Sequence, residues 1–240
     1  MQLTNFNTLT FDCYGTLIDW ETGIFESLKP WLEREGITAT RDEVLELFAH
    51  YESAEESANP KMLYPDLLAR VHKDLAQHWG VQSTDEDASA FGASVGKWPA
   101  FPDSASALHY LKQHYKLVIL SNVDRASFAE SNKKLEVEFD AIFTAQDIGS
   151  YKPDLANFEY MLAKLAQMGI EKSQILHTAQ SLFHDHVPAT KMGLATCWID
   201  RRHNQEGWGA TAPPPADATI NFHMNSMAEF VRQHGVKTHG

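Results

Sequence analysis

Residues 9–20, LTFDCYGTLIDW, place an aspartate directly after an apolar stretch and directly before a tight turn. The turn residues are Gly15 and Thr16, and the apolar stretch is typical of a buried strand. In open α/β folds, ligands bind at the carboxyl ends of parallel strands. We therefore expect residues 6–12 to form a first strand that carries Asp12 to the ligand-binding edge of a sheet.

The chain beyond residue 100 alternates between short apolar runs and segments of helical length. The runs are typical of parallel strands that are buried on both faces, and their alternation with helices predicts a doubly wound α/β fold. The expected strands are residues 116–121, 141–145, 174–179 and 194–200, and the expected helices are residues 103–114, 125–135, 154–168 and 185–192.

Residues 20–98 differ from the rest, because they show helical spacing of apolar residues and no convincing strand. We interpret this segment as a helical cap inserted after the first strand, with residues 1–19 and 99–240 forming the core. Pro99 and Pro102 stiffen the return to the core. The acidic run at residues 52–56 is expected to be a solvated helix face.

Composition narrows the partners of this 240-residue chain. It has 20 basic and 32 acidic residues and a formal net charge of −12, which argues against nucleic acids and anionic membranes. The sequence has no apolar run of spanning length and does not begin like a signal peptide. Its two cysteines, Cys13 and Cys197, are expected to be reduced thiols of a cytoplasmic protein.

Polar residues follow four of the expected strands, and the fold would bring them to one edge of the sheet. Each of these residues taken alone is also common as a turn or helix cap. Together they offer two carboxylates, hydroxyl and amide groups and an ammonium, which favours a functional site. The residues are Asp12 with Thr16, Ser121 with Asn122, Lys152, and Asp185.

In this order, these motifs resemble those of the haloacid dehalogenase superfamily. Tyr14, two residues after Asp12, resembles the L-2-haloacid dehalogenase branch rather than the phosphatases, which carry a second aspartate at that position. The longer stretches DCYGTLIDWETG, SYKP, HTAQSLFHDH and CWIDRRH are similar to those of a ring-opening group within that branch, the L-azetidine-2-carboxylate hydrolases.

The resemblance implies a role for each catalytic candidate. Asp12 would be the nucleophile and would form an aspartyl ester that water hydrolyses. Lys152 would hold Asp12 ionised through its opposite charge. Thr16 would donate a hydrogen bond to Asp12, and Asp185 would pair with Lys152 or orient the hydrolytic water.

The remaining candidates are expected to bind a small 2-substituted carboxylate substrate. Ser121 and Asn122, together with the backbone N–H groups near Cys13 and Tyr14, would hold its carboxylate. The family resemblance is also compatible with a homodimer.

Tyr14 bears on the type of reaction. A phenol with a usual pKa of about 10 is a poor general acid at neutral pH. A halide leaves without a proton, and a strained ring ammonium already carries one. We therefore expect displacement at an sp³ 2-carbon, either dehalogenation of an L-2-haloacid or ring opening of L-azetidine-2-carboxylate, with no cofactor required.

Two alternatives remain open. One is a phosphatase of the same superfamily, in which Asp12 and Asp185 would hold Mg²⁺. The other is a non-catalytic binding protein that retains the fold.

Three departures from the dehalogenase pattern favour a leaving group other than halide. The early cap helix at residues 43–52 has no arginine, and Arg41 lies just ahead of it. The family's tyrosine after the lysine corresponds to Phe158, and its Ser-Ser-Asn before the last aspartate is replaced by residues 180–182.

The run His184-Asp185-His186 invites a metal interpretation. Alternate residues do not share a helix face, so both histidines are instead expected on the surface or in packing.

Overall fold

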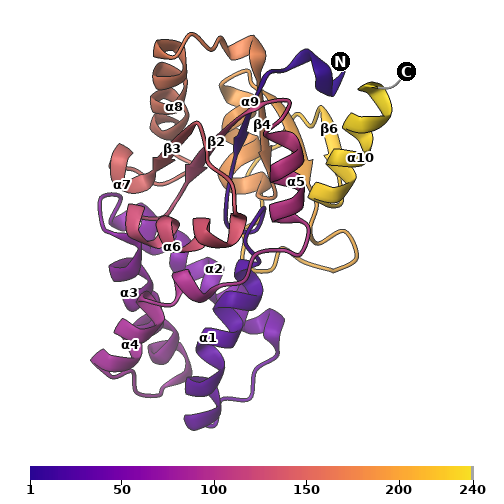
Figure 1. Cartoon of the computed structure of the whole chain (residues 1–240). Helices are drawn as coiled ribbons and strands as arrows, with labels where there is room; N and C mark the ends of the chain where they lie inside the picture. The colour runs from indigo at the N-terminus through magenta and orange to yellow at the C-terminus, as the bar shows by residue number, and fades with distance from the viewer. Residues whose placement is uncertain (239–240) are drawn as a thin grey trace.

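The computed structural model of the chain describes residues 1–238 and contains one six-stranded parallel sheet (Figure 1). The strand order β3-β2-β1-β4-β5-β6 places β1 in the middle, and the doubly wound prediction is confirmed. The strands are β1 (Thr8–Phe11), β2 (Lys116–Ser121), β3 (Ala141–Thr144), β4 (Ile175–Ala179), β5 (Ala195–Ile199) and β6 (Phe222–Met224).

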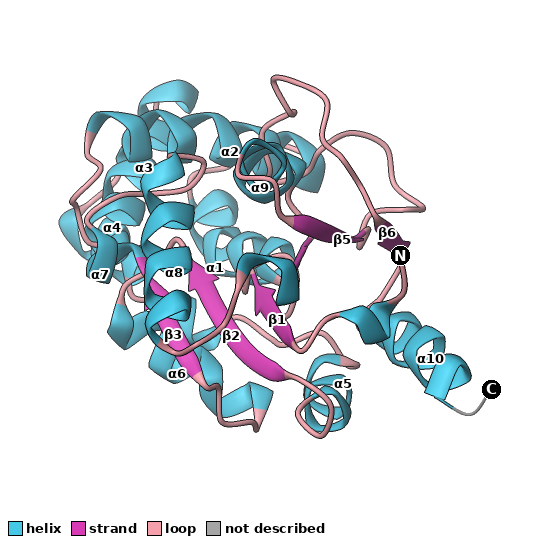
Figure 2. Ribbon diagram, turned by 90° about the horizontal axis from the view of Figure 1, so that it is seen from above, coloured by secondary structure: helices cyan, strands magenta, loops and turns pink. Residues whose placement is uncertain are grey.

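Helices cover both faces of this sheet (Figure 2). Every residue of β1 and β4 is buried, which explains why both strands are largely apolar. On one face lie α5 (Ser104–Leu111), α6 (Arg125–Leu135) and α10 (Met227–Thr238). On the other face lie α8 (Leu155–Gln167) and α9 (Val187–Lys191). The short helix α7 (Ala145–Ile148) follows β3. The turns of 3₁₀ helix are Leu3–Asn5, Val95–Lys97 and Lys172–Gln174, and Leu182–His186 is π-helical.

Four helices between β1 and β2 gather at the carboxyl ends of the strands (Figure 1). They are α1 (Trp20–Arg34), α2 (Arg41–Ala58), α3 (Tyr64–Trp79) and α4 (Asp85–Gly92). The side chains of Asp19, Thr40 and Thr84 cap the first backbone N–H groups of α1, α2 and α4, which fixes where these helices begin. We call α1–α4 the cap helices.

Three elements were missed in the sequence: α7, β6 and α10. β6 has only three residues, and its place depends on contacts with β5. Asn221 contributes one of them, because its Oδ1 accepts a hydrogen bond from the backbone N–H of Thr196 at 2.9 Å. The helix expected at 185–192 begins earlier, at Leu182, because the Ser181 side chain caps the N–H of His184.

None of the described helices is long and apolar enough to cross a membrane. Cys13 and Cys197 are both free and buried.

The cap helices return to the core through a tight junction at Trp98. Asp19 donates its backbone N–H to the oxygen of Pro99 at 2.8 Å, and Ile18 bridges Ala100. Gly23 of α1 lies against the Trp98 indole, where an added Cβ would come within 2.1 Å of the ring carbon Cγ. Close packing of α1 on the junction therefore requires a residue without a side chain at this position.

We predict that Gly23→Ala lowers the free energy of unfolding by about 1–3 kcal/mol, because the new methyl group overpacks a filled site. Denaturant unfolding followed by tryptophan fluorescence measures the change. In a double-mutant cycle with Trp98→Ala, the alanine at position 23 should cost less, since the clashing ring is gone. An equal cost in both backgrounds would contradict this explanation.

Candidate active site

Asp12 lies at the carboxyl end of β1, in the turn that the sequence indicates. Gly15 adopts a φ of +89° there, a conformation that favours glycine. Thr16 Oγ1 donates a hydrogen bond of 2.6 Å to Asp12 Oδ2 and accepts one of 2.9 Å from the backbone N–H of Gln180. The turn after β1 and the turn after β4 thus jointly orient one oxygen of Asp12.

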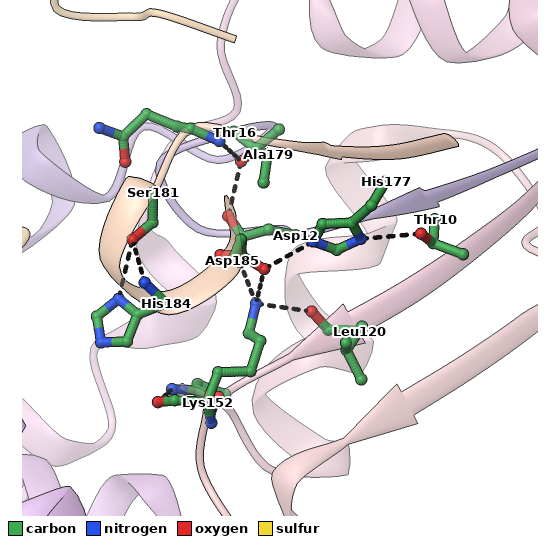
Figure 3. Close-up of polar contacts among 12 residues, drawn as sticks. Thr10, Asp12, Thr16, Leu120, Lys152, His177, Ala179, Ser181, His184 and Asp185 are labelled. Atoms are coloured by element: carbon green, nitrogen blue, oxygen red, sulfur yellow. Dashed lines mark hydrogen bonds and ion pairs between the residues drawn. The ribbon is translucent and has the colours of Figure 1, made fainter. Parts of the chain in front are cut away.

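Lys152 occupies the centre of the site (Figure 3). Its Nζ donates to Asp12 Oδ1 at 3.0 Å, to Asp185 Oδ1 at 2.8 Å and to the backbone oxygen of Leu120 at 3.0 Å. These bonds account for all three ammonium hydrogens, and the residue is only 1% exposed. The ammonium is therefore committed to the core and has no hydrogen left for another group.

The pKa values of these three groups depend on one another. Burial opposes the charge of Lys152, but Asp12 and Asp185 outweigh it and raise the lysine pKa above its usual range. Burial by itself would raise the pKa of Asp185, but Lys152 and His177 outweigh it and hold that pKa below its usual range. Burial raises the pKa of Asp12, although Lys152 opposes the rise. Asp12 is thus the less stabilised anion, as suits a nucleophile.

His177 is a site residue that the sequence analysis missed. It lies on β4, and its Nε2 contacts Asp185 Oδ1 at 3.0 Å while its Nδ1 contacts Thr10 Oγ1 at 2.9 Å. Thr10 and His177 are paired in register across β1 and β4. A histidine in a short, fully buried strand was the available signal. The ring of Phe158 packs edge-on against His177, so this phenylalanine supports the site from behind.

Asn122 connects Lys152 to the cap helices. Its Oδ1 accepts from the backbone N–H of Lys152 at 2.7 Å, and its Nδ2 donates to the backbone oxygen of Lys152 at 3.0 Å and to Glu56 Oε1 at 2.9 Å. Substrate binding by Asn122 stays a prediction, and these contacts show that its carboxamide also holds the backbone of Lys152. The neighbouring Ser121 Oγ is buried and has no hydrogen-bond partner among residues 1–238.

Cys13 and Tyr14 directly follow Asp12. Tyr14 OH lies 2.8 Å from Ser131 Oγ, and burial raises the pKa of the phenol well above its ordinary value. Tyr14 therefore cannot supply a proton readily near neutral pH. Cys13 is fully buried in the hydrophobic core, where burial raises the pKa of its thiol.

A small cavity of about 30 Å³ lies between the core and the cap helices. It brings together the expected Asp12, Tyr14, Asn122, Lys152 and Asp185, whereas Thr16, Cys13 and Ser121 are not among its described lining residues. The cap side contributes Trp20, Glu52, Glu56 and Tyr64, and the core adds Val123, Ser181 and His184.

The prediction of a solvated face at residues 52–56 is wrong for Glu52 and Glu56. They are only 2% and 5% exposed, because they lie one turn apart on the inner side of α2. Tyr64 OH donates to Glu52 Oε1 at 2.5 Å. Burial, with the repulsion of Glu56, raises the pKa of Glu52 to about 8, and burial raises that of Glu56 to about 8.

The histidines of the run at 184–186 differ in environment, and neither is on the surface. His186 packs inside, with Nε2 2.8 Å from the oxygen of Ala179. His184 lines the cavity: its Nδ1 contacts Ser181 Oγ at 3.2 Å, while its Nε2 lies 3.6 Å from Glu56 Oε2. Burial lowers the pKa of His184, which favours the neutral ring.

The donor set at Asp12 and Asp185 does not fit a magnesium ion well. Mg²⁺ requires several oxygen ligands in octahedral geometry. The Lys152 ammonium already binds one oxygen of each carboxylate, and the described residues contain no cluster of three or more acidic, histidine or cysteine side chains able to hold a metal.

A family model described as haloacid dehalogenase-like hydrolase matches residues 6–178. The chain belongs to this family. The match covers both the nucleophile turn and the lysine, and thus the centre of the site. The site described above is therefore that of a haloacid dehalogenase-like hydrolase.

Two curated proteins show the breadth of the family. The (S)-2-haloacid dehalogenase 4A of Burkholderia cepacia is 24% identical over 228 residues, which cover 91% of this chain and 90% of the dehalogenase. Pyrimidine 5'-nucleotidase YjjG of Escherichia coli is 24% identical over 110 residues, which cover 45% of this chain and only 48% of the nucleotidase.

Solved structures of L-2-haloacid dehalogenases share the fold. The enzyme from Xanthobacter autotrophicus aligns with a TM-score of 0.77 at 15% identity, covering 95% of this chain and 97% of the other. A defluorinating L-2-haloacid dehalogenase aligns with a TM-score of 0.78 at 18% identity, covering 98% of both chains. The likeness extends over the cap helices as well as the core.

We predict that Lys152→Met lowers the free energy of unfolding at pH 7 by about 3–5 kcal/mol, since two buried carboxylates lose their counter-charge. The deficit should shrink as the pH falls, because protonation removes the repulsion between Asp12 and Asp185. Denaturant unfolding across pH measures this. Lys133→Met, which breaks an exposed ion pair with Glu130, is the control and should have little effect.

We also predict that Glu52 and Glu56 make stability fall with rising pH. Their folded pKa values of about 8 lie above the ordinary 4.5, so the folded state holds more protons between these values. Their contribution is complete below the unfolded pKa and is lost as pH rises through the folded pKa. Each should add a slope of up to about 1.4 kcal/mol per pH unit.

Unfolding measured from pH 5 to pH 8 tests this expectation. Glu52→Gln and Glu56→Gln should each flatten the curve, whereas Glu46→Gln, at an exposed position of the same helix, should leave it unchanged. A curve of unchanged slope in both glutamine variants of the buried pair would contradict the assigned pKa values.

Proposed function

We propose that this hydrolase displaces a leaving group from the sp³ 2-carbon of a small carboxylate through an aspartyl ester on Asp12. The supporting observation is that Asp12 is held between Lys152 and Thr16 beside a small cavity, while the residue two positions on is a phenol bonded to Ser131. This arrangement supplies a desolvated nucleophile, and the side chain two positions after it is a phenol of raised pKa that is a poor general acid.

In the first step, a carboxylate oxygen of Asp12 forms a bond to the 2-carbon. The bond from that carbon to the leaving group breaks, and its electron pair departs with the leaving group. A halide departs as an anion. A protonated ring nitrogen departs as a neutral amine that remains tethered to the product through the opened ring.

In the second step, water attacks the carbonyl carbon of the ester and releases a 2-hydroxy acid. One water oxygen remains in the Asp12 carboxylate, and one proton is released, which a tethered amine can take up. Asp185 Oδ2 is suited to accept a hydrogen bond from this water. The oxygen is buried, has no hydrogen-bond partner within residues 1–238, and belongs to a residue that lines the same cavity as Asp12.

We propose ring opening of L-azetidine-2-carboxylate ahead of dehalogenation of an L-2-haloacid. Halide departure is aided by a cation. Lys152 is the one cationic side chain in the described lining of the cavity, and its hydrogens are committed. Arg41 is exposed and donates to Thr22 Oγ1 at 3.0 Å, so it does not take the place of a cap arginine.

The substrate carboxylate is proposed to bind near Ser121, whose buried Oγ has no partner in the described part of the chain. Backbone N–H groups around Cys13 and Tyr14 would complete this contact. The carboxylate would thereby be held on the core side, with the leaving group directed toward the cap helices.

We predict that repeated turnover in ¹⁸O-labelled water places label in the Asp12 side chain, because the ester hydrolyses at its carbonyl carbon. Mass spectrometry of the peptide containing residues 9–20 measures it. Asp12→Asn should reduce turnover by several orders of magnitude without unfolding the protein. Label that enters only the product would show direct attack by water and exclude the ester.

The substrate is tested with L-azetidine-2-carboxylate, L-2-chloropropionate and a generic phosphate ester, each with and without Mg²⁺. Opening of the ring without added metal is the expected result. Chloride release with an untouched azetidine would favour the dehalogenase, and chelator-sensitive cleavage of the phosphate ester would favour a phosphatase.

A further inference from the structure

Two buried glutamates of α2 form the cap-side wall of the cavity. Glu52 and Glu56 are one helical turn apart, and both line the cavity opposite the core carboxylates. Like charges at this spacing repel, and burial of unpaired carboxylates is costly. Both effects lower the stability of the fold. The reason for burying this pair is therefore expected to lie in the ligand that the cavity binds.

The hydrogen bonds of this pair leave acceptor oxygens unused. Glu52 Oε1 accepts from Tyr64 OH, and Glu56 Oε1 accepts from Asn122 Nδ2. Glu52 Oε2 is buried and has no partner among the described residues. The unpartnered oxygen belongs to a side chain that is 98% buried and that lines the cavity, which indicates a missing donor.

No cationic side chain among residues 1–238 meets this demand. Lys152 spends its three hydrogens on Asp12, Asp185 and Leu120. His184 approaches Glu56 Oε2 only to 3.6 Å and makes no hydrogen bond through Nε2 within residues 1–238. A small ligand with a positive charge and N–H donors is the chemistry that would satisfy this wall.

We infer that Glu52 and Glu56 form a cation subsite that determines specificity, selecting small 2-carboxylates whose leaving group is a protonated ring nitrogen over neutral analogues. This inference rests on the proposed displacement at Asp12 and adds the residues that recognise the leaving group. A substrate spanning the cavity would place its 2-carbon at Asp12 and its ammonium toward α2.

An outer hollow adjoins this subsite. It has a volume of about 360 Å³ and shares Glu56 and Lys152 with the cavity, while Tyr151 and Phe183 form part of its wall. Glu56 therefore contacts both spaces. A cationic ligand that approaches through the hollow would meet this carboxylate before it reaches Asp12.

Binding of a cation at this subsite must also move protons. The empty pair holds protons near neutral pH because its pKa values are raised to about 8. An ammonium in the cavity favours the ionised carboxylates and so expels protons. The other titratable groups that face the pair are Tyr14, Tyr64, Tyr151, His184, Lys152, Asp12 and Asp185.

The test compares two unstrained ligands of equal size, L-proline and (S)-tetrahydrofuran-2-carboxylate, which differ in a ring ammonium against a ring oxygen. Isothermal titration calorimetry of the wild-type protein at pH 7, in two buffers of different ionisation enthalpy, gives affinity and proton release. We expect the cationic ring to bind about tenfold tighter or more, and to release protons. The ether should release none.

Variants assign the preference to residues. Glu52→Gln and Glu56→Gln keep the shape of the side chains, and each should reduce the preference to a few-fold and reduce proton release. Glu46→Gln on the exposed side of α2 should retain both. Thermal unfolding checks that each variant is folded, and the proton release of the wild-type protein decides the question if a buried variant is not.

Equal affinity of the wild-type protein for the two rings would overturn the inference, as would an unchanged preference in both buried variants. If the five-membered rings are too large to bind, L-azetidine-2-carboxylate and oxetane-2-carboxylate on Asp12→Asn replace them, with the same outcomes. None of these measurements needs turnover, so a failure of the aspartyl ester in the ¹⁸O experiment is recognised separately.

Discussion

The site depends on one buried ammonium that neutralises two carboxylates. Lys152 connects the ends of β1, β2 and the π-helical turn after β4, because its three hydrogens reach Asp12, Leu120 and Asp185. Bringing these groups out of water is costly unless the geometry is satisfied at every hydrogen. The parallel sheet provides that geometry, since it ends all of these strands at the same edge.

The cap helices complete the site with the opposite electrostatic character. The core side pairs its two carboxylates with Lys152, whereas the cap side presents two carboxylates and adds no Lys or Arg to the described lining of the cavity. The chain thus combines an aspartate–lysine pair on the core side of the cavity with two glutamates on the cap side. In the proposed reaction this wall faces the leaving group, so its two carboxylates bear on what can leave rather than on how it is displaced.

The central strands and the core residues of the site could be predicted from the sequence, because short apolar runs and turn residues mark their positions locally. Residues 116–121 match β2 to the residue, and the Gly15 turn indicated the position of Asp12. β6 and α10 were missed because β6 is short and is fixed by pairing with β5. Glu52 and Glu56 were misjudged because charged residues are rarely buried, and only the packing of α2 on the core reveals their environment.

Asn122 links the core to the cap helices through hydrogen bonds of unequal number. Its carboxamide grips the backbone of Lys152 through two hydrogen bonds, but it reaches the cap through a single one, to Glu56. If α2 moved away from the sheet to admit a ligand, the single bond would break and the double one would persist. Lys152 would then keep its contact with Asp12 while α2 is displaced. The return of α2 would bring its two carboxylates back to the cavity, where they face an incoming positive charge.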